Sequence, residues 1–131
     1  MVHEWQWLSR HGDASAAQLD RLARVYNVLS GKWMVFCPSA HVDAVWQRIA
    51  HAIAAGRLGS SAKVSPFDGD GEHVICVYAD NYLDREDVQR LRQGLRQLGH
   101  HETLLFKPDV YTHCGIYKGN EWGIPTCIFK E

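Results

Sequence analysis

The stretch SAKVSPFDGDGEHVICVY, residues 61–78, decides the fold class of this chain. Residues 61–65 alternate between polar and apolar side chains, whereas residues 73–78 are a largely apolar run. The alternation predicts a strand with one covered face, and the apolar run is typical of a central strand. The Asp and Gly residues at 66–72 predict only a loop between them. Two consecutive strands without an intervening helix argue against a doubly wound parallel sheet.

Three helical patterns surround these two strands. Apolar residues recur at helical spacing over residues 15–29 and in stretches that begin at Ser39 and at Asp84. Ser39 and Asp84 are expected to cap the helices that follow them, because a short polar side chain accepts from the first free N–H groups. Gly56 and Gly99 are expected to end these two helices in the left-handed conformation.

Further strands are predicted on both sides of this region. Residues 32–37 form a strand pattern that Pro38 stops, and residues 1–12 predict a short strand or a packed arm. The remaining strands are expected at residues 103–107, 110–117 and 125–129. The order is therefore α-β-α-β-β-α-β-β-β, which favours an α+β domain with an antiparallel or mixed sheet and helices on one face.

Composition limits the function classes. The chain has 131 residues, 46% of them apolar and 22% charged, which fits a single domain over residues 1–131. The net charge of −1 gives no global field that would attract nucleic acid or an anionic membrane. A polyanion would therefore have to bind to a local patch of positive charge.

The cysteines and the N-terminal residues indicate a cytoplasmic protein. None of the four cysteines belongs to a Cys-x-x-Cys pair, and Cys37, Cys76 and Cys114 lie within apolar runs. Buried, reduced thiols in a reducing compartment are the expected reading. The first residues do not resemble a signal peptide, and no apolar run approaches membrane-spanning length, so no membrane partner is expected.

The predicted strand at residues 110–117 suggests a polar sheet face. Its alternation would direct Tyr111, His113, Gly115 and Tyr117 away from the helices. Such a face combines an imidazole with aromatic rings, and a glycine there would let a ligand approach the backbone closely.

Lysines and hydroxyls are expected on the same face. Lys63 lies between Ser61 and Ser65 on one polar strand face, and Lys32 and Lys107 stand at strand ends. Ammonium groups neutralise phosphate, hydroxyls donate to its oxygens, and flat rings stack on bases. The sequence thus predicts a site for a phosphorylated ligand, although an ordinary solvated sheet face would show the same alternation.

Trp122 completes the predicted ligand set. It stands in the turn at residues 119–123, where it could either stack on a ligand or pack under the loop. The predicted ligand-binding residues are Lys32, Lys63, Ser65, Lys107, Tyr111, His113, Tyr117 and Trp122. Neither a metal nor a cofactor is expected: no cysteines and histidines have zinc spacing, and the twelfth position of the calcium-like loop that starts at Asp68 is Ala79.

Several stretches resemble the family of basophilic leukaemia-expressed proteins, a domain of unknown function. The stretches are GKW at 31–33, GRLGSSAKVS at 56–65, HVICVY at 73–78, KPDVYT at 107–112 and GIY at 115–117. The resemblance implies a fold like that of translation initiation factor 4E: a curved, mostly antiparallel sheet backed on one face by about three helices.

The element order is also distantly similar to that of the phosphothreonine lyases, which eliminate phosphate with a lysine base. That resemblance implies Lys63 as the base, whereas Met34 stands where the lyases have their acid histidine, so His113 would have to supply the acid. Three functions stay open: binding of a nucleotide, RNA end or phosphopeptide; β-elimination by a lyase-like enzyme; and a protein-interaction module that uses the tyrosine-rich face.

Overall fold

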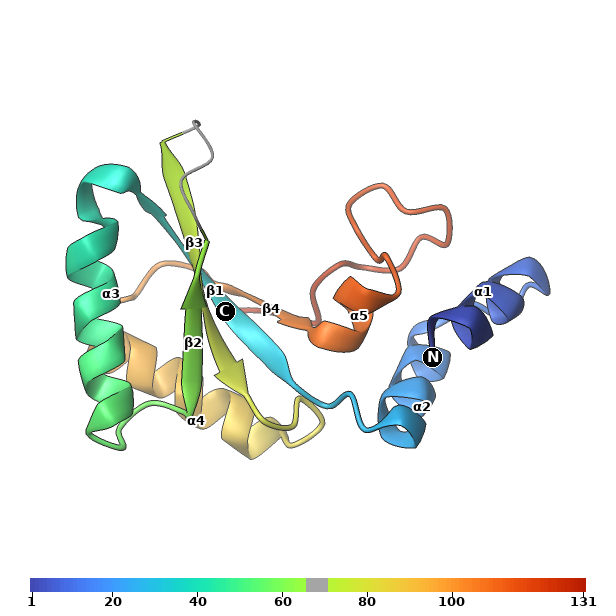
Figure 1. Ribbon diagram of the computed structural model, residues 1–131, viewed down its shortest axis with the longest axis horizontal. Coiled ribbons are helices and arrows are strands. Elements are labelled where there is room, and N and C mark those ends of the chain that lie inside the picture. Colours follow the sequence, from blue (N-terminus) through green and yellow to red (C-terminus); the bar gives the residue numbers. More distant parts are fainter. Residues whose placement is uncertain (66–70) are drawn as a thin grey trace.

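The computed structural model describes residues 1–65 and 71–131, and its centre is a five-stranded antiparallel sheet (Figure 1). The strands lie in the order β2-β3-β1-β4-β5, and each neighbouring pair is antiparallel. Their bounds are β1 (Gly31–Pro38), β2 (Ser61–Val64), β3 (Glu72–Ala79), β4 (Leu105–Pro108) and β5 (Phe129–Lys130). The predicted α+β class with an antiparallel sheet is confirmed.

Five helices accompany the sheet in the described residues, in two groups. They are α1 (Val2–Arg10), α2 (Ala16–Tyr26), α3 (Ser39–Ala54), α4 (Arg85–Gln97) and α5 (Asp109–His113). α3 and α4 lie against one face of the sheet, while α1, α2 and α5 gather beyond one of its ends (Figure 1). The helix expected over residues 15–29 is therefore not a third helix behind the sheet. It ends at Tyr26, where Asn27 turns the chain in the left-handed conformation, and it packs against α5.

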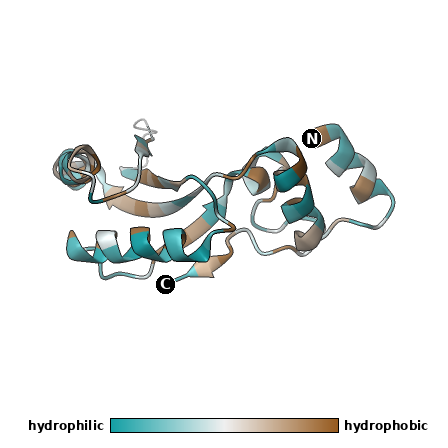
Figure 2. Ribbon diagram, turned by 90° about the horizontal axis from the view of Figure 1, so that it is seen from below, coloured by the Kyte–Doolittle hydropathy of each residue, from teal (hydrophilic) through white to brown (hydrophobic). Residues whose placement is uncertain are grey.

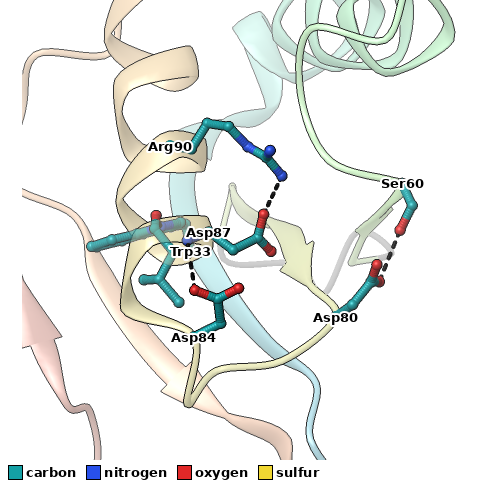
Figure 3. Close-up of polar contacts among 7 residues, drawn as sticks. Trp33, Ser60, Asp80, Asp84, Asp87 and Arg90 are labelled. Atoms are coloured by element: carbon teal, nitrogen blue, oxygen red, sulfur yellow. Dashed lines mark hydrogen bonds and ion pairs between the residues drawn. The ribbon is translucent and has the colours of Figure 1, made fainter.

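One part of the core lies between the sheet and the helices α3 and α4, and it continues among α1, α2 and α5. Trp33 on β1 is fully buried, and its indole Nε1 donates to the backbone oxygen of Val88 at 2.9 Å, which fastens α4 to β1 (Figure 3). Phe106 on β4 meets Trp33 edge-on at 5.2 Å between ring centroids. A Cβ on Gly31 would lie 2.7 Å from the Phe106 ring, so only glycine permits this close approach. Each fully buried apolar side chain stabilises the fold by about 1.5–3 kcal/mol.

The predicted helix ends are mostly confirmed. Asp84 caps α4, because its carboxylate accepts from the backbone N–H of Asp87 at 3.3 Å (Figure 3). Gly56 and Gly99 follow their helices with φ values of +74° and +100°. The ribbon of α4 is largely hydrophilic, in keeping with a surface helix that buries only a narrow apolar stripe (Figure 2).

The capping role predicted for Ser39 is wrong. Pro38 occupies the cap position, and Ser39 is the first helical residue, without a side-chain capping bond. Its hydroxyl instead lies 3.0 Å from Nε2 of His73. This contact ties the start of α3 to β3.

The strand predicted at residues 110–117 is also wrong. The segment forms α5 and then turns, because Pro108 ends β4 and the Asp109 N–H is drawn to the backbone oxygen of Ser30 at 2.9 Å. Val110 and Tyr111 are buried on this helix, so the apparent alternation is not that of a strand. Residues 125–129 contribute only the start of the short β5.

The N-terminal segment differs from its prediction as well. α1 is a helix rather than a strand or arm, and the spacing of three between Trp5 and Leu8 places both side chains in the core. The loop expected at 66–72, including the calcium-like stretch, falls for the most part outside the described residues. No helix in the described part is long and apolar enough to cross a bilayer.

Candidate functional site

The sheet face opposite α3 and α4, here called the open face, carries the predicted lysines. The strand register places four of its side chains in one row across the sheet, in the order Ser61, Tyr78, Lys32 and Lys107. α5 and the segment after it contact the end of this row that holds the two lysines. The lysines are consequently buried, at 8% and 7% exposure for Lys32 and Lys107.

Lys63 lies in the next row of the open face. It pairs with Cys76, which in turn stands opposite Met34. Three strand spacings of about 4.8 Å and one step of about 6.7 Å separate the backbones of Lys63 and Lys107. The three lysines thus share a face, but the backbone of Lys63 lies well away from the backbones of the other two.

Lys32 has its charge compensated by α5. Its Nζ lies 2.6 Å from Oδ1 of Asp109 and donates to the hydroxyl of Thr112 at 2.9 Å. Asp109 also accepts from the Ser30 hydroxyl at 2.5 Å. Residues 109 and 112 reach the same lysine because positions three apart share one side of a helix. Neither partner is predicted from the sequence, although Pro108 before an acidic residue is a signal for a helix start.

In the described residues, Lys107 lacks the charged and hydrogen-bonding partners that Lys32 has. Its Nζ lies 4.1 Å from the centroid of the Tyr117 ring. Among residues 1–65 and 71–131, no carboxylate forms an ion pair with Lys107 and no group accepts a hydrogen bond from it. Burial and then the charge of Lys32 lower the pKa of Lys107, while Cys127 opposes the shift. Lys107 is therefore a buried cation next to a second cation.

Tyr111 and Ser65, both predicted to bind the ligand, instead contribute to the packing and hydrogen bonding of the fold. Tyr111 is 3% exposed in the core beside α2, and burial followed by the charge of Asp20 raises its pKa to about 12. The hydroxyl of Ser65 accepts from the backbone N–H of Val74 at 2.9 Å. Tyr117, by contrast, is 56% exposed above Lys107.

His113 and Trp122 lie in a separate groove. This groove, of about 640 Å³, runs between α1 and the segment after α5, and Trp5 also lines it. Trp122 donates from Nε1 to the Ser9 hydroxyl at 2.6 Å and meets Trp5 edge-on at 5.1 Å. Neither side chain joins the lysine row, so the structure divides the predicted set between two places.

The described side chains include no group of three or more His, Cys, Asp or Glu residues arranged to hold a metal ion. The four cysteines are free thiols. Burial raises the pKa of Cys76 on the open face, with Lys32 opposing the shift. This thiol is therefore held in its neutral form between the lysines.

Comparison with known families identifies this chain. A family model described as basophilic leukemia-expressed protein Bles03 matches residues 6–115. The match extends from α1 to the end of α5 and includes the whole lysine row. The chain belongs to this family. The likeness to initiation factor 4E and to the phosphothreonine lyases stays a prediction.

Proposed function

We propose that this Bles03-family chain binds a phosphorylated ligand on the open face, with the phosphate at Lys107 beside Lys32. A nucleotide, an RNA end and a phosphopeptide are the ligand classes that share this chemistry. The proposal rests on the charge balance of the lysine row.

One observation carries the proposal: the Lys107 side chain is largely buried, and its ammonium has neither a carboxylate nor a hydrogen-bond acceptor among the described residues. Burying an uncompensated cation costs free energy, so such a group is retained where a ligand supplies the anion. Lys32, Lys107 and Asp109 together have two positive charges and one negative charge, which leaves one positive charge for a ligand. A phosphate oxygen would satisfy the free donors of Lys107.

The rest of the row supports the same chemistry. Tyr78 and Ser61, which carry hydroxyls, stand in the same row across the strands as the two lysines. Lys63, in the next row, offers a second cation to a ligand that extends across the strands. The exposed Phe36, at 53%, borders this face and favours a ligand with an apolar part.

The lyase-like alternative places the chemistry on Lys63. Its acid candidate, His113, lies in the groove beside Trp5 and not on the open face, and Met34 has no proton to give. This geometry favours binding without elimination. Incubation with a phosphothreonine peptide tests the alternative, because elimination would release phosphoric acid and lower the peptide mass.

A cytoplasmic location is part of the proposal. Four free thiols, two of them buried, suit a reducing compartment. A fluorescent fusion that accumulates in an oxidising compartment would contradict it.

The decisive experiment is calorimetric titration with inorganic phosphate, a mononucleotide, a 5′-phosphorylated RNA and a phosphothreonine peptide. At least one phosphorylated probe should bind, and its unphosphorylated counterpart should not. Lys107→Gln should weaken binding about tenfold or more, since a hydrogen bond to a charged group contributes about 1.5–3 kcal/mol. Added salt should weaken binding further.

Arg48→Gln is the matched control. Arg48 is exposed on α3, on the covered side of the sheet, so this change removes one positive charge far from the site. Equal binding by the Lys107 and Arg48 variants would contradict the proposal, as would the absence of binding by every phosphorylated probe.

A further inference from the structure

We infer that the phosphorylated ligand is a single-stranded oligonucleotide that crosses the open face from β5 to β2. Lys107 binds one of its phosphates, so this ligand class rests on the proposed function. Two further lysines, Lys63 and Lys130, bind phosphates on either side. The placement of the strand lysines, the rings beside them and the width of the sheet all favour such a chain.

Four of the five strands carry one lysine each, and all four lysines stand on the open face. They are Lys32, Lys63, Lys107 and Lys130, on β1, β2, β4 and β5. On each of these strands a side chain next to the lysine packs into the core on the covered side: Trp33, Ala62, Val64, Phe106 and Phe129. Because successive residues of a strand point to opposite faces, the lysines point away from that core.

Three of these lysines have no charge partner in the described residues. Lys63, Lys107 and Lys130 form no ion pair and donate no hydrogen bond there, in contrast to Lys32. Glu72 is the one carboxylate on the described strands, and it stands about 20 Å along β3 from the lysine row. Positive charge is therefore concentrated on one face of a chain whose net charge is −1, which suits a polyanion.

Aromatic rings stand beside these lysines. Tyr78 occupies the position between Ser61 and Lys32 in the lysine row. The exposed ring of Tyr117 has its centroid 4.1 Å from Nζ of Lys107. Unpaired bases stack on such rings while nearby cations bind the backbone phosphates. This combination favours a single strand over a phosphopeptide, which has no bases, and over a duplex, whose bases are already stacked.

The spacing of the free lysines indicates that more than one nucleotide is bound. One strand spacing and one two-residue step separate the backbones of Lys130 and Lys107, which is about 8 Å. Three strand spacings and one such step, about 16 Å, separate Lys107 from Lys63. A mononucleotide at Lys107 cannot contact all three ammonium groups, whereas a chain can. About 4 nucleotides is the smallest site that OB-fold domains use for single strands.

A length series of 5′-phosphorylated oligouridylates, titrated by calorimetry, tests the inference. Affinity should rise from the mononucleotide to about the tetranucleotide and then level off. For the tetranucleotide, log affinity should fall with log salt concentration at a slope of about −2, since each of three phosphate contacts contributes about −0.7. A parallel series of oligothymidylates compares DNA with RNA, and length-dependent binding of either one supports the inference.

Variants at the two edge lysines separate a bound chain from a single bound phosphate. Lys63→Gln combined with Lys130→Gln should weaken tetranucleotide binding about tenfold, at about threefold for each exposed contact. The same variant should bind inorganic phosphate and the mononucleotide as the wild type does. Arg24→Gln combined with Arg48→Gln is the matched control, because it removes two exposed positive charges from α2 and α3. Tyr117→Leu should weaken binding of the tetranucleotide more than binding of inorganic polyphosphate, which has no bases to stack.

Failure of this inference is distinguishable from failure of the proposed function. Equal affinities for the mononucleotide and the tetranucleotide, or equal losses in the two double variants, would overturn the single strand and leave the phosphate site at Lys107 in place. Binding of a phosphothreonine peptide without binding of the tetranucleotide would do the same. The absence of binding by every phosphorylated probe would overturn both.

Discussion

The two faces of the sheet each contain a buried cation, and the two cations have opposite surroundings. Arg92 on α4 is 1% exposed and donates to the backbone oxygens of Glu131, His100 and Glu102 at 2.9, 3.0 and 2.7 Å. Lys107 on the open face is 7% exposed and has no such acceptor among the described residues. Burial lowers the pKa of both groups.

This difference separates a structural cation from a candidate functional one. The guanidinium of Arg92 holds the segment after α4 and the C-terminal residue in place, so its donors are used within the fold. The ammonium of Lys107 has no hydrogen-bond acceptor among the described residues, so the fold leaves its donors available. Burial alone would not distinguish the two residues.

The largest effect is expected from Arg92→Met. The change leaves three backbone oxygens without their donor and should lower the free energy of unfolding by about 3 kcal/mol. Urea denaturation measures this loss. Arg96→Met, at a less buried position of the same helix, should change the stability by less than about 0.5 kcal/mol. If Arg92→Met and Arg96→Met lost similar amounts of stability, Arg92 would not be the structural cation that sets it apart from Lys107.

Lys107→Met should change the free energy of unfolding in the opposite direction and stabilise the protein. An apolar side chain of similar length replaces a buried cation beside a like charge, which should raise the free energy of unfolding by about 1 kcal/mol. The same variant should lose phosphate binding. Lys130→Met, on the exposed edge strand, should do neither. A destabilised Lys107→Met protein would show that the ammonium has a structural role.

The smallest expected effect is a change in how folding stability depends on pH. Because the pKa of Lys107 is lowered on folding, the unfolded chain binds more protons between the folded pKa and the ordinary value of 10.5. Stability should therefore rise with pH in that window. Denaturation of the wild type and Lys107→Met at several pH values gives the difference. If stability changed with pH in the same way in both proteins, burial would not shift the pKa of Lys107.

The half of the molecule that contains the helix-backed sheet was predictable from sequence. The alternation at residues 61–65 and the apolar run at 73–78 became β2 and β3, and the Asp84 cap formed as expected. In each case one local pattern determines both the element and its buried face. The register then places Lys32 opposite Lys107, which no local pattern in the sequence predicts.

The C-terminal third was not predictable in the same way. Residues 110–117 alternate as a strand would, yet Tyr111 packs into the core from a helix. A five-residue helix is too short to show a helical period, so tertiary packing decides its conformation. The partners of Lys32 were missed for this reason, and with them the contrast between a compensated and an uncompensated lysine.

The short outer strands of the sheet have a consequence for self-association. β2 has four residues and β5 has two, so each offers only a few backbone groups to a strand from another molecule. Lys63 and Lys130 place a positive charge on each of these edges, and like charges repel a second copy. Short, positively charged edges of this kind disfavour edge-to-edge pairing of two sheets.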